Sequence, residues 1–154
     1  MLPNDAMYSR LRATIESLRY WVPTIADVAR VAESETPAQW KVAITPNIES
    51  ACPLELALGS TQRYTLTIAG ESYSDRAIVS LDLFLPLLEA ISEGRVVQRR
   101  WVSLATGAVR AIETIVTLAD GSTWRDGRTL EAVAAAIPRE STERHDRHFL
   151  PYRR

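Results

Sequence analysis

Basic and aromatic side chains gather between positions 95 and 125, and these residues are the best suited to bind another molecule. Arginine beside tryptophan on an extended strand can hold an anionic partner by charge while the indole ring stacks, as in proteins that bind single-stranded nucleic acid. A small anionic ligand would suit such a surface equally well. The candidate ligand or partner surface consists of Arg95, Arg99, Arg100, Trp101, Arg110, Glu113, Trp124 and Arg125.

The same residues also have a purely structural interpretation. A two-residue turn at Thr106–Gly107 would place Glu113 opposite Arg100, and Ile112 opposite Trp101. The first would be a cross-strand ion pair and the second a pair on the core face. Nucleic-acid-binding domains are usually basic, whereas this chain has a formal net charge of −1. The sequence therefore argues against nucleic acid as the partner.

Groups that could catalyse a reaction or bind a metal are few. Cys52 is the single cysteine, so the sequence predicts no internal disulfide and no cysteine-based zinc site. A nucleophilic thiol needs a base beside it, and both histidines, His145 and His148, lie in a distant polar segment. On a helix they would align, with Glu143 and Asp146 nearby, but a firm metal site needs three or four ligands. We expect no metal and no cofactor.

The carboxylates indicate no reaction either. Asp75, Asp82, Glu89 and Glu93 surround a predicted helix, and paired carboxylates can perform acid–base chemistry when their pKa values differ. A helix cap explains Asp82, and a solvated face explains Glu89 and Glu93. The sequence contains no phosphate-binding loop, dinucleotide fingerprint, nucleophile elbow or zinc-protease motif. We therefore predict no catalytic residues and favour a protein that is not an enzyme.

Length and composition suit one soluble domain. The chain has 154 residues, of which 46% are hydrophobic and 24% charged. This is enough to form a hydrophobic core without disulfides or bound metals. Residues 1–93 carry 7 basic and 12 acidic groups, whereas residues 94–154 carry 11 basic and 7 acidic groups. This bias could support head-to-tail contact between copies or an anionic partner for the second part.

We predict a cytoplasmic protein outside the membrane from the absence of targeting and membrane-spanning signals in the sequence. The first residues lack a basic start and a long apolar stretch, and no apolar run could span a bilayer. A single cysteine suits a reducing compartment. Arginine makes up 17 of the 18 basic residues, Lys41 being the exception, which we attribute to the coding bias of a GC-rich bacterial genome.

Two helices are predicted at the start of the chain. Apolar residues spaced by three and four indicate a helix over residues 5–22 and another over residues 24–33. The second resembles the first helix of the helix-turn-helix in the lactose-repressor family of transcription regulators. That resemblance implies a recognition helix directly afterwards. Residues 33–40 are instead acidic, broken by Pro37, and lead into a strand pattern, so we do not predict DNA recognition.

The middle of the chain is predicted to form strands around a third helix. Alternating apolar residues indicate strands at 40–44, 54–58 and 64–68, and another strand is expected over 77–81. Helical spacing over 81–91 is closed by Gly94, with Pro86 marking either a kink or the first turn.

The last part of the chain is predicted to form an antiparallel meander and a closing helix. Two long strands over 95–104 and 109–118 are followed by a hairpin at Asp120–Gly121 and a short strand through Trp124. An alanine-rich helix over 130–137 would close a domain of residues 1–138, leaving a polar charged tail over 139–154.

This order predicts an α+β fold. We expect two N-terminal helices and a mostly antiparallel sheet of about 5–7 strands, with helices packed on one face.

The leading functional hypothesis is a non-enzymatic domain that binds protein and associates with itself as a homodimer. The alternative is a small-ligand-binding or enzyme domain with a pocket between a curved sheet and the helices. Nucleic-acid binding ranks third.

Overall fold

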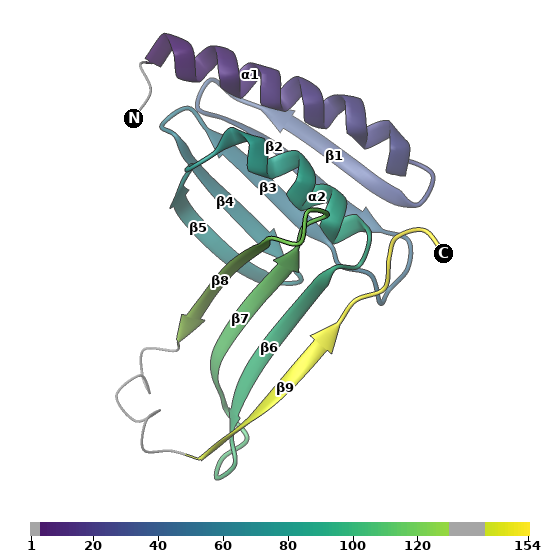
Figure 1. Ribbon diagram of the computed structural model, residues 1–154, viewed down its shortest axis with the longest axis vertical. Coiled ribbons are helices and arrows are strands. Elements are labelled where there is room, and N and C mark those ends of the chain that lie inside the picture. The colour runs from purple at the N-terminus through teal and green to yellow at the C-terminus, as the bar shows by residue number, and fades with distance from the viewer. Residues whose placement is uncertain (1–3, 130–140) are drawn as a thin grey trace.

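The structure is a computed structural model that describes residues 4–129 and 141–154. Within them lie two α-helices, α1 (Asn4–Trp21) and α2 (Phe84–Ser92), and two antiparallel sheets (Figure 1). The α+β class is therefore confirmed, although the strands form two sheets instead of one. The first sheet has the order β1 (Ala29–Glu35), β2 (Gln39–Pro46), β3 (Leu54–Gly59), β4 (Arg63–Ile68) and β5 (Glu71–Ala77). The second has the order β8 (Thr123–Thr129), β7 (Val109–Thr117), β6 (Val96–Ser103) and β9 (Thr142–His148).

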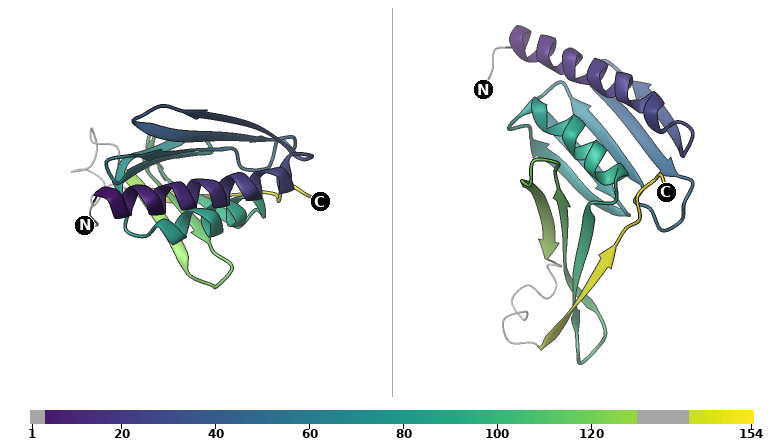
Figure 2. Two further views of the ribbon diagram at one scale, coloured as in Figure 1. Left: turned by 90° about the horizontal axis from the view of Figure 1, so that it is seen from above. Right: turned by 45° about the vertical axis from the view of Figure 1, so that its right-hand side comes forward.

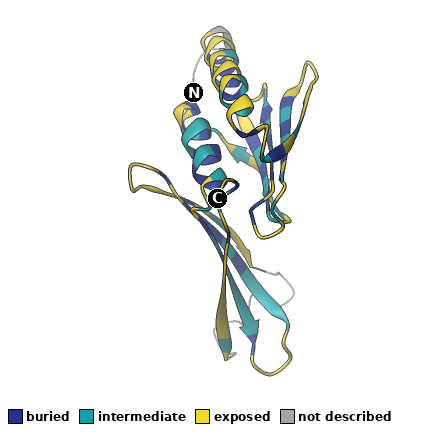
Figure 3. Cartoon of the chain, turned by 90° about the vertical axis from the view of Figure 1, so that its right-hand side faces the viewer, coloured by how far each residue is buried: buried dark blue, intermediate teal, exposed yellow. Residues whose placement is uncertain are grey.

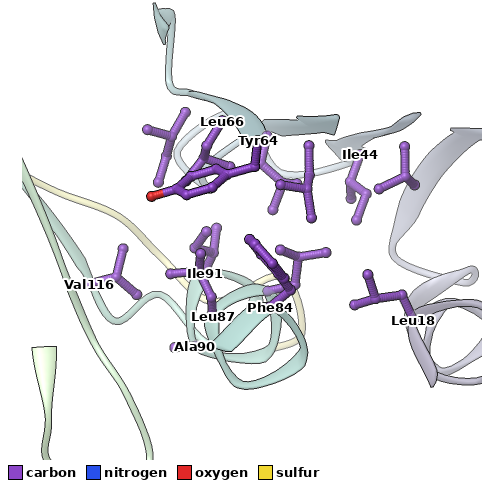
Figure 4. Close-up of a cluster of buried hydrophobic side chains, with 14 of the residues drawn as sticks. Leu18, Ile44, Tyr64, Leu66, Phe84, Leu87, Ala90, Ile91 and Val116 are labelled. Carbon is purple, nitrogen blue, oxygen red and sulfur yellow. The ribbon is translucent and has the colours of Figure 1, made fainter. Parts of the chain in front are cut away.

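The hydrophobic core lies between the first sheet and the two helices. Strands β2, β3 and β4 alternate buried and half-buried residues, as the sequence predicts. Helix α1 turns one stripe of buried residues to the sheet, and α2 adds five more buried residues. Figure 2 shows both helices on the same side of the sheet, and Figure 4 shows Leu18, Phe84 and Leu87 pointing towards Ile44, Tyr64 and Leu66. Each such side chain contributes about 1.5–3 kcal/mol when fully buried.

The predicted second helix over residues 24–33 is wrong. Val22–Ile25 forms a single 3₁₀ turn and Ala29–Glu35 forms strand β1. Seven consecutive residues of β1 pair with β2, from Ala29 opposite Pro46 to Glu35 opposite Trp40. This backbone pairing overrides the local helical pattern. The segment that resembles a DNA-binding helix is therefore a turn followed by a strand.

The strand predicted over residues 77–81 is also wrong. Strand β5 ends at Ala77, and Leu81–Leu83 forms a 3₁₀ turn that leads into α2. Ser80 caps this turn by accepting a hydrogen bond from the amide of Asp82. Pro86 is the third residue of α2, in the first turn, where its missing amide costs no helical hydrogen bond.

The second sheet is a Greek key, because β6, β7 and β8 follow one another and β9 returns to lie beside β6. Its inner face, turned towards β5 and α2, joins the first sheet at one end through polar contacts. Tyr73 and Thr114 share a buried hydrogen bond of 2.7 Å, and Gln98 Nε2 donates to the carbonyl of Ile68 at 3.1 Å. The other end extends away from the rest of the molecule (Figure 3).

Part of the predicted polar tail over 139–154 forms a strand, and its residues 139 and 140 lie outside the described residues. Thr142–His148 forms β9, which pairs with β6 over seven residues. The segment after it crosses to the first sheet, where Tyr152 is buried and its hydroxyl donates to the carbonyl of Cys52. Arg153 then pairs with Asp27 at 2.6 Å. The helix predicted over 130–137 and the domain boundary at 138 lie outside the described residues.

Candidate functional site

The register of the second sheet divides the eight predicted surface residues between its two faces. Opposite residues of neighbouring strands share a face, and successive residues alternate. Arg99, Trp101, Glu113 and Arg125 lie on the outer face, whereas Arg100 and Trp124 lie on the inner face. The remaining two lie outside the regular pairing, Arg95 just before β6 and Arg110 at an irregularity in β7.

The predicted pairing of Arg100 with Glu113 is wrong by one residue. Arg99 lies opposite Glu113, and Arg100 lies opposite Ile112. The hairpin is longer than two residues, since the amide of Ser103 donates to the carbonyl of Ala108. Arg110 has no opposite residue between the two registers and forms a bulge. A shift of one residue moves every side chain of a strand to the other face.

The outer face carries an apolar centre with charges of both signs around it. Trp101 and Val97 on β6 are half-buried, Ala111 lies opposite Trp101, and Ile115 lies opposite Val97. Asp146 on β9 makes ion pairs with Arg144 at 3.3 Å and with Arg99 at 3.8 Å. We call this surface the outer patch: Val97, Arg99, Trp101, Ala111, Glu113, Ile115, Arg125, Arg144 and Asp146.

The outer patch includes two β9 residues that the sequence reasoning missed, Arg144 and Asp146. Their segment has no apolar periodicity, because both faces of β9 are charged. The signal that could have located the strand follows it, since Phe149 and Tyr152 are buried and anchor the end of the chain.

The inner face of the second sheet carries a basic row on β6 and β9. Arg100 lies opposite His145 on β9, and Arg147 is the next inner-face residue of that strand. The guanidinium of Arg147 lies 4.7 Å from the centroid of the Phe149 ring, a cation–π contact. Arg100 is half-buried, and its Nε is buried without a hydrogen-bond partner. We call Arg100, His145 and Arg147 the inner row.

Three predicted surface residues have structural roles. Trp124 is buried in the core, and its indole nitrogen donates to the hydroxyl of Tyr64 at 3.1 Å. Arg95 pairs with Glu93 at 3.1 Å. Arg110 donates to the hydroxyl of Thr106 at 3.4 Å across the hairpin turn. None of the three belongs to the outer patch or the inner row.

The structure offers little support for catalysis or metal binding. Burial raises the pKa of the Cys52 thiol to about 12, so it stays protonated at neutral pH and is a poor nucleophile. Among residues 4–129 and 141–154, no three His, Cys, Asp or Glu side chains come together to hold a metal ion. In the same residues, no helix is long and apolar enough to cross a membrane.

Open hollows lie between α1 and α2 and beside the end of the chain. The first, of about 370 Å³, is lined by Arg10, Thr14, Ser17 and Asp82 together with Ala13, Leu81, Leu85 and Pro86. The second, of about 510 Å³, is lined by residues of Val22–Ile25, by Ser92 and Glu93, and by Pro151, Tyr152 and Arg153.

Searches of family models, curated proteins and solved structures find no match to this chain.

Proposed function

We propose that this protein is a non-enzymatic interaction domain that associates with a second copy of itself through the outer patch. The observation that carries the proposal is Trp101, a half-buried tryptophan on a sheet face where Asp146 pairs with Arg99 and Arg144 of the same face. Tryptophan, tyrosine and arginine are the residues that dominate binding energy at protein interfaces. Arg144 of β9 lies opposite Trp101, and Arg99 lies two residues before it on β6, which supports an interface at this position.

The charges of the outer patch favour a second copy as the partner. In a two-fold dimer the same surface meets itself, so each charge must find its opposite on an identical patch. The patch offers Arg99, Arg125 and Arg144 beside Glu113 and Asp146. A purely basic surface would repel its copy, whereas this mixture can form complementary pairs around the apolar centre.

The expected energetics are dominated by the apolar centre. Truncating a central tryptophan in an interface typically costs about 2–4 kcal/mol of binding free energy. Exposed ion pairs at the rim contribute about 0–1 kcal/mol each, and they determine orientation more than affinity. Loss of Trp101 should therefore abolish association at concentrations where loss of Arg125 only weakens it.

A cytoplasmic location in a bacterium belongs to the same proposal. The single cysteine is buried and forms no disulfide among the described residues, which suits a reducing compartment. The preference for arginine over lysine suits a GC-rich bacterial genome.

Light scattering coupled to gel filtration, run over a wide concentration series, tests the proposal. We expect the mass of a dimer for the wild-type chain and that of a monomer for Trp101→Arg. The matched control is Tyr20→Arg, which changes an aromatic residue of α1 that is 87% exposed and should leave the dimer intact. A wild-type chain that stays monomeric throughout, or a Trp101→Arg chain that stays dimeric, would overturn the proposal.

A further inference from the structure

We propose that the inner row of the second sheet is a binding site for an oxyanion group, a carboxylate or a phosphate, of a small ligand. Arg100 is the central residue, with His145 and Arg147 of β9 beside it. The site lies on the face opposite the outer patch, so it does not depend on the proposed self-association.

Arg100 differs from Arg76 and Arg128 in having no acceptor among the described residues. Arg76 binds Asp126 at 2.8 Å, and Arg128 binds Glu71 at 2.7 Å, so both are neutralised where the two sheets join. The described residues provide no such partner for Arg100, and its Nε is buried. A buried donor without an acceptor costs about 1–3 kcal/mol. An oxyanion that accepts from Arg100 would remove this cost.

The register places a histidine and a second arginine next to Arg100. His145 lies directly opposite, at a typical Cβ separation of about 4.5–5.5 Å, and Arg147 lies on the diagonal at about 7–8 Å. The one carboxylate on the same face of β9 is Glu143, and its Oε2 lies 3.4 Å from His145 Nε2. Two arginines therefore face one carboxylate that a histidine already contacts, which leaves net positive charge for a ligand.

A second unsatisfied polar group lies two residues before Arg100 on the same face. Gln98 is fully buried, and its Nε2 donates to the carbonyl of Ile68, but its Oε1 has no partner. Buried polar atoms are nearly always paired with protein or ordered water, so such an atom calls for an explanation. A water molecule that donates one hydrogen bond to Gln98 Oε1 and another to the bound oxyanion would satisfy both acceptors.

The guanidinium group explains why the ligand should carry an oxyanion instead of a simple halide. Its planar fork donates two parallel hydrogen bonds to a carboxylate or a phosphate, and these charge-assisted bonds are among the strongest in proteins. Chloride would respond to the same charge without this geometry. The comparison of anions at equal ionic strength therefore separates a built site from general attraction.

Nuclear magnetic resonance titrations of the full chain with succinate and with inorganic phosphate test the site, with chloride as the reference. We expect saturable shifts of resonances from Arg100, His145 and Arg147 that chloride does not produce. Succinate binding without phosphate binding would identify a carboxylate ligand, and the reverse a phosphate ligand.

Variants complete the test. Arg100→Gln should weaken binding roughly ten- to a hundred-fold, as expected for the loss of charge-assisted hydrogen bonds. The matched control is Arg30→Gln, which removes an exposed arginine of β1 in the first sheet and should leave the affinity unchanged. Arg147→Gln provides a second probe should Arg100→Gln disturb the fold. Absence of shifts beyond those with chloride, or equal affinity in Arg100→Gln and Arg30→Gln, would overturn the proposal.

Discussion

The two sheets are built in the same antiparallel way but are stabilised differently. The first sheet has one face covered by α1 and α2, with the second sheet packed beside them against Tyr64 and Tyr73, and its strands contribute ten buried apolar or aromatic residues to the core from β2 to β5. The second sheet places Val96, Val116 and Trp124 in that core, all near the end that joins the first sheet. Towards its free end, both faces carry half-buried and charged residues.

This difference separates residues that hold the fold from residues that are available for binding. A sheet covered by helices can be explained by burial alone. The second sheet carries arginines and Trp101 outside the hydrophobic core, so packing of the core does not explain why these residues are there. Both proposals therefore concern the second sheet, one on each of its faces.

The largest expected effect comes from making the same substitution in the two sheets. Ile68 of β4 is fully buried in the core, whereas Ile115 of β7 is 7% exposed and lies outside the core cluster. We expect Ile68→Ala to lower the free energy of unfolding by about 3–5 kcal/mol and Ile115→Ala by about 1–2 kcal/mol. Urea denaturation of both variants measures the difference. Equal losses would show that the second sheet is as tightly packed as the first.

The next largest effect concerns the connection between the sheets. Gly94, between α2 and β6, has φ = +78°, and a Cβ there would lie 2.8 Å from the carbonyl oxygen of Phe149. Alanine combines an unfavourable backbone conformation with a clash against the end of the chain. We expect Gly94→Ala to cost about 2–3 kcal/mol. Gly121→Ala is the control, because its φ is similar, +88°, but its Cβ would meet open space. If Gly94→Ala lowers the free energy of unfolding no more than Gly121→Ala does, the close approach of Gly94 to the Phe149 carbonyl is contradicted.

The fold was predictable wherever one face of an element is apolar. The alternation of Trp40, Val42 and Ile44 identifies β2, and the helical spacing in α1 and α2 identifies the helices. Strands β1, β5 and β9 were missed because their side chains carry no such signal. They are edge strands held by backbone pairing to β2, β4 and β6, and this pairing does not depend on side-chain type.

The candidate site remains a prediction, and the structure shows only where its residues lie. Arg99, Arg100, Arg110 and Arg125 all belong to strands of the second sheet, whereas Arg95 lies just before β6. Their division between two faces depends on the bulge at Arg110. The residue types around Arg110 do not predict a bulge at that position. The partners of Arg99 and Arg100 on β9 come from a segment predicted to be a tail, so neither face could be assembled from the sequence.

The smallest expected effect tests how the end of the chain is fastened to the first half of the molecule. Arg153 donates to both carboxylate oxygens of Asp27, at 2.6 and 2.7 Å, and this pairing holds the pKa of Asp27 below its ordinary value. The stabilisation is present above the ordinary aspartate pKa and is lost as the pH falls through the lowered value. Because both groups are exposed, the loss should be local.

Amide hydrogen exchange of Leu150 and Tyr152 measures this loosening, since their amides donate to Ser50 and Ser92 across the same junction. We expect their protection to fall at acid pH more than that of amides in β3. In Asp27→Asn the protection of these two amides should already be lower at neutral pH. Its further fall at acid pH should then be close to that of amides in β3. Arg153 also donates to the carbonyl of Thr24 at 2.9 Å. A small part of the protection of the two amides should therefore persist in that variant. Unchanged protection in Asp27→Asn would show that the burial of Tyr152 alone holds the end of the chain in place.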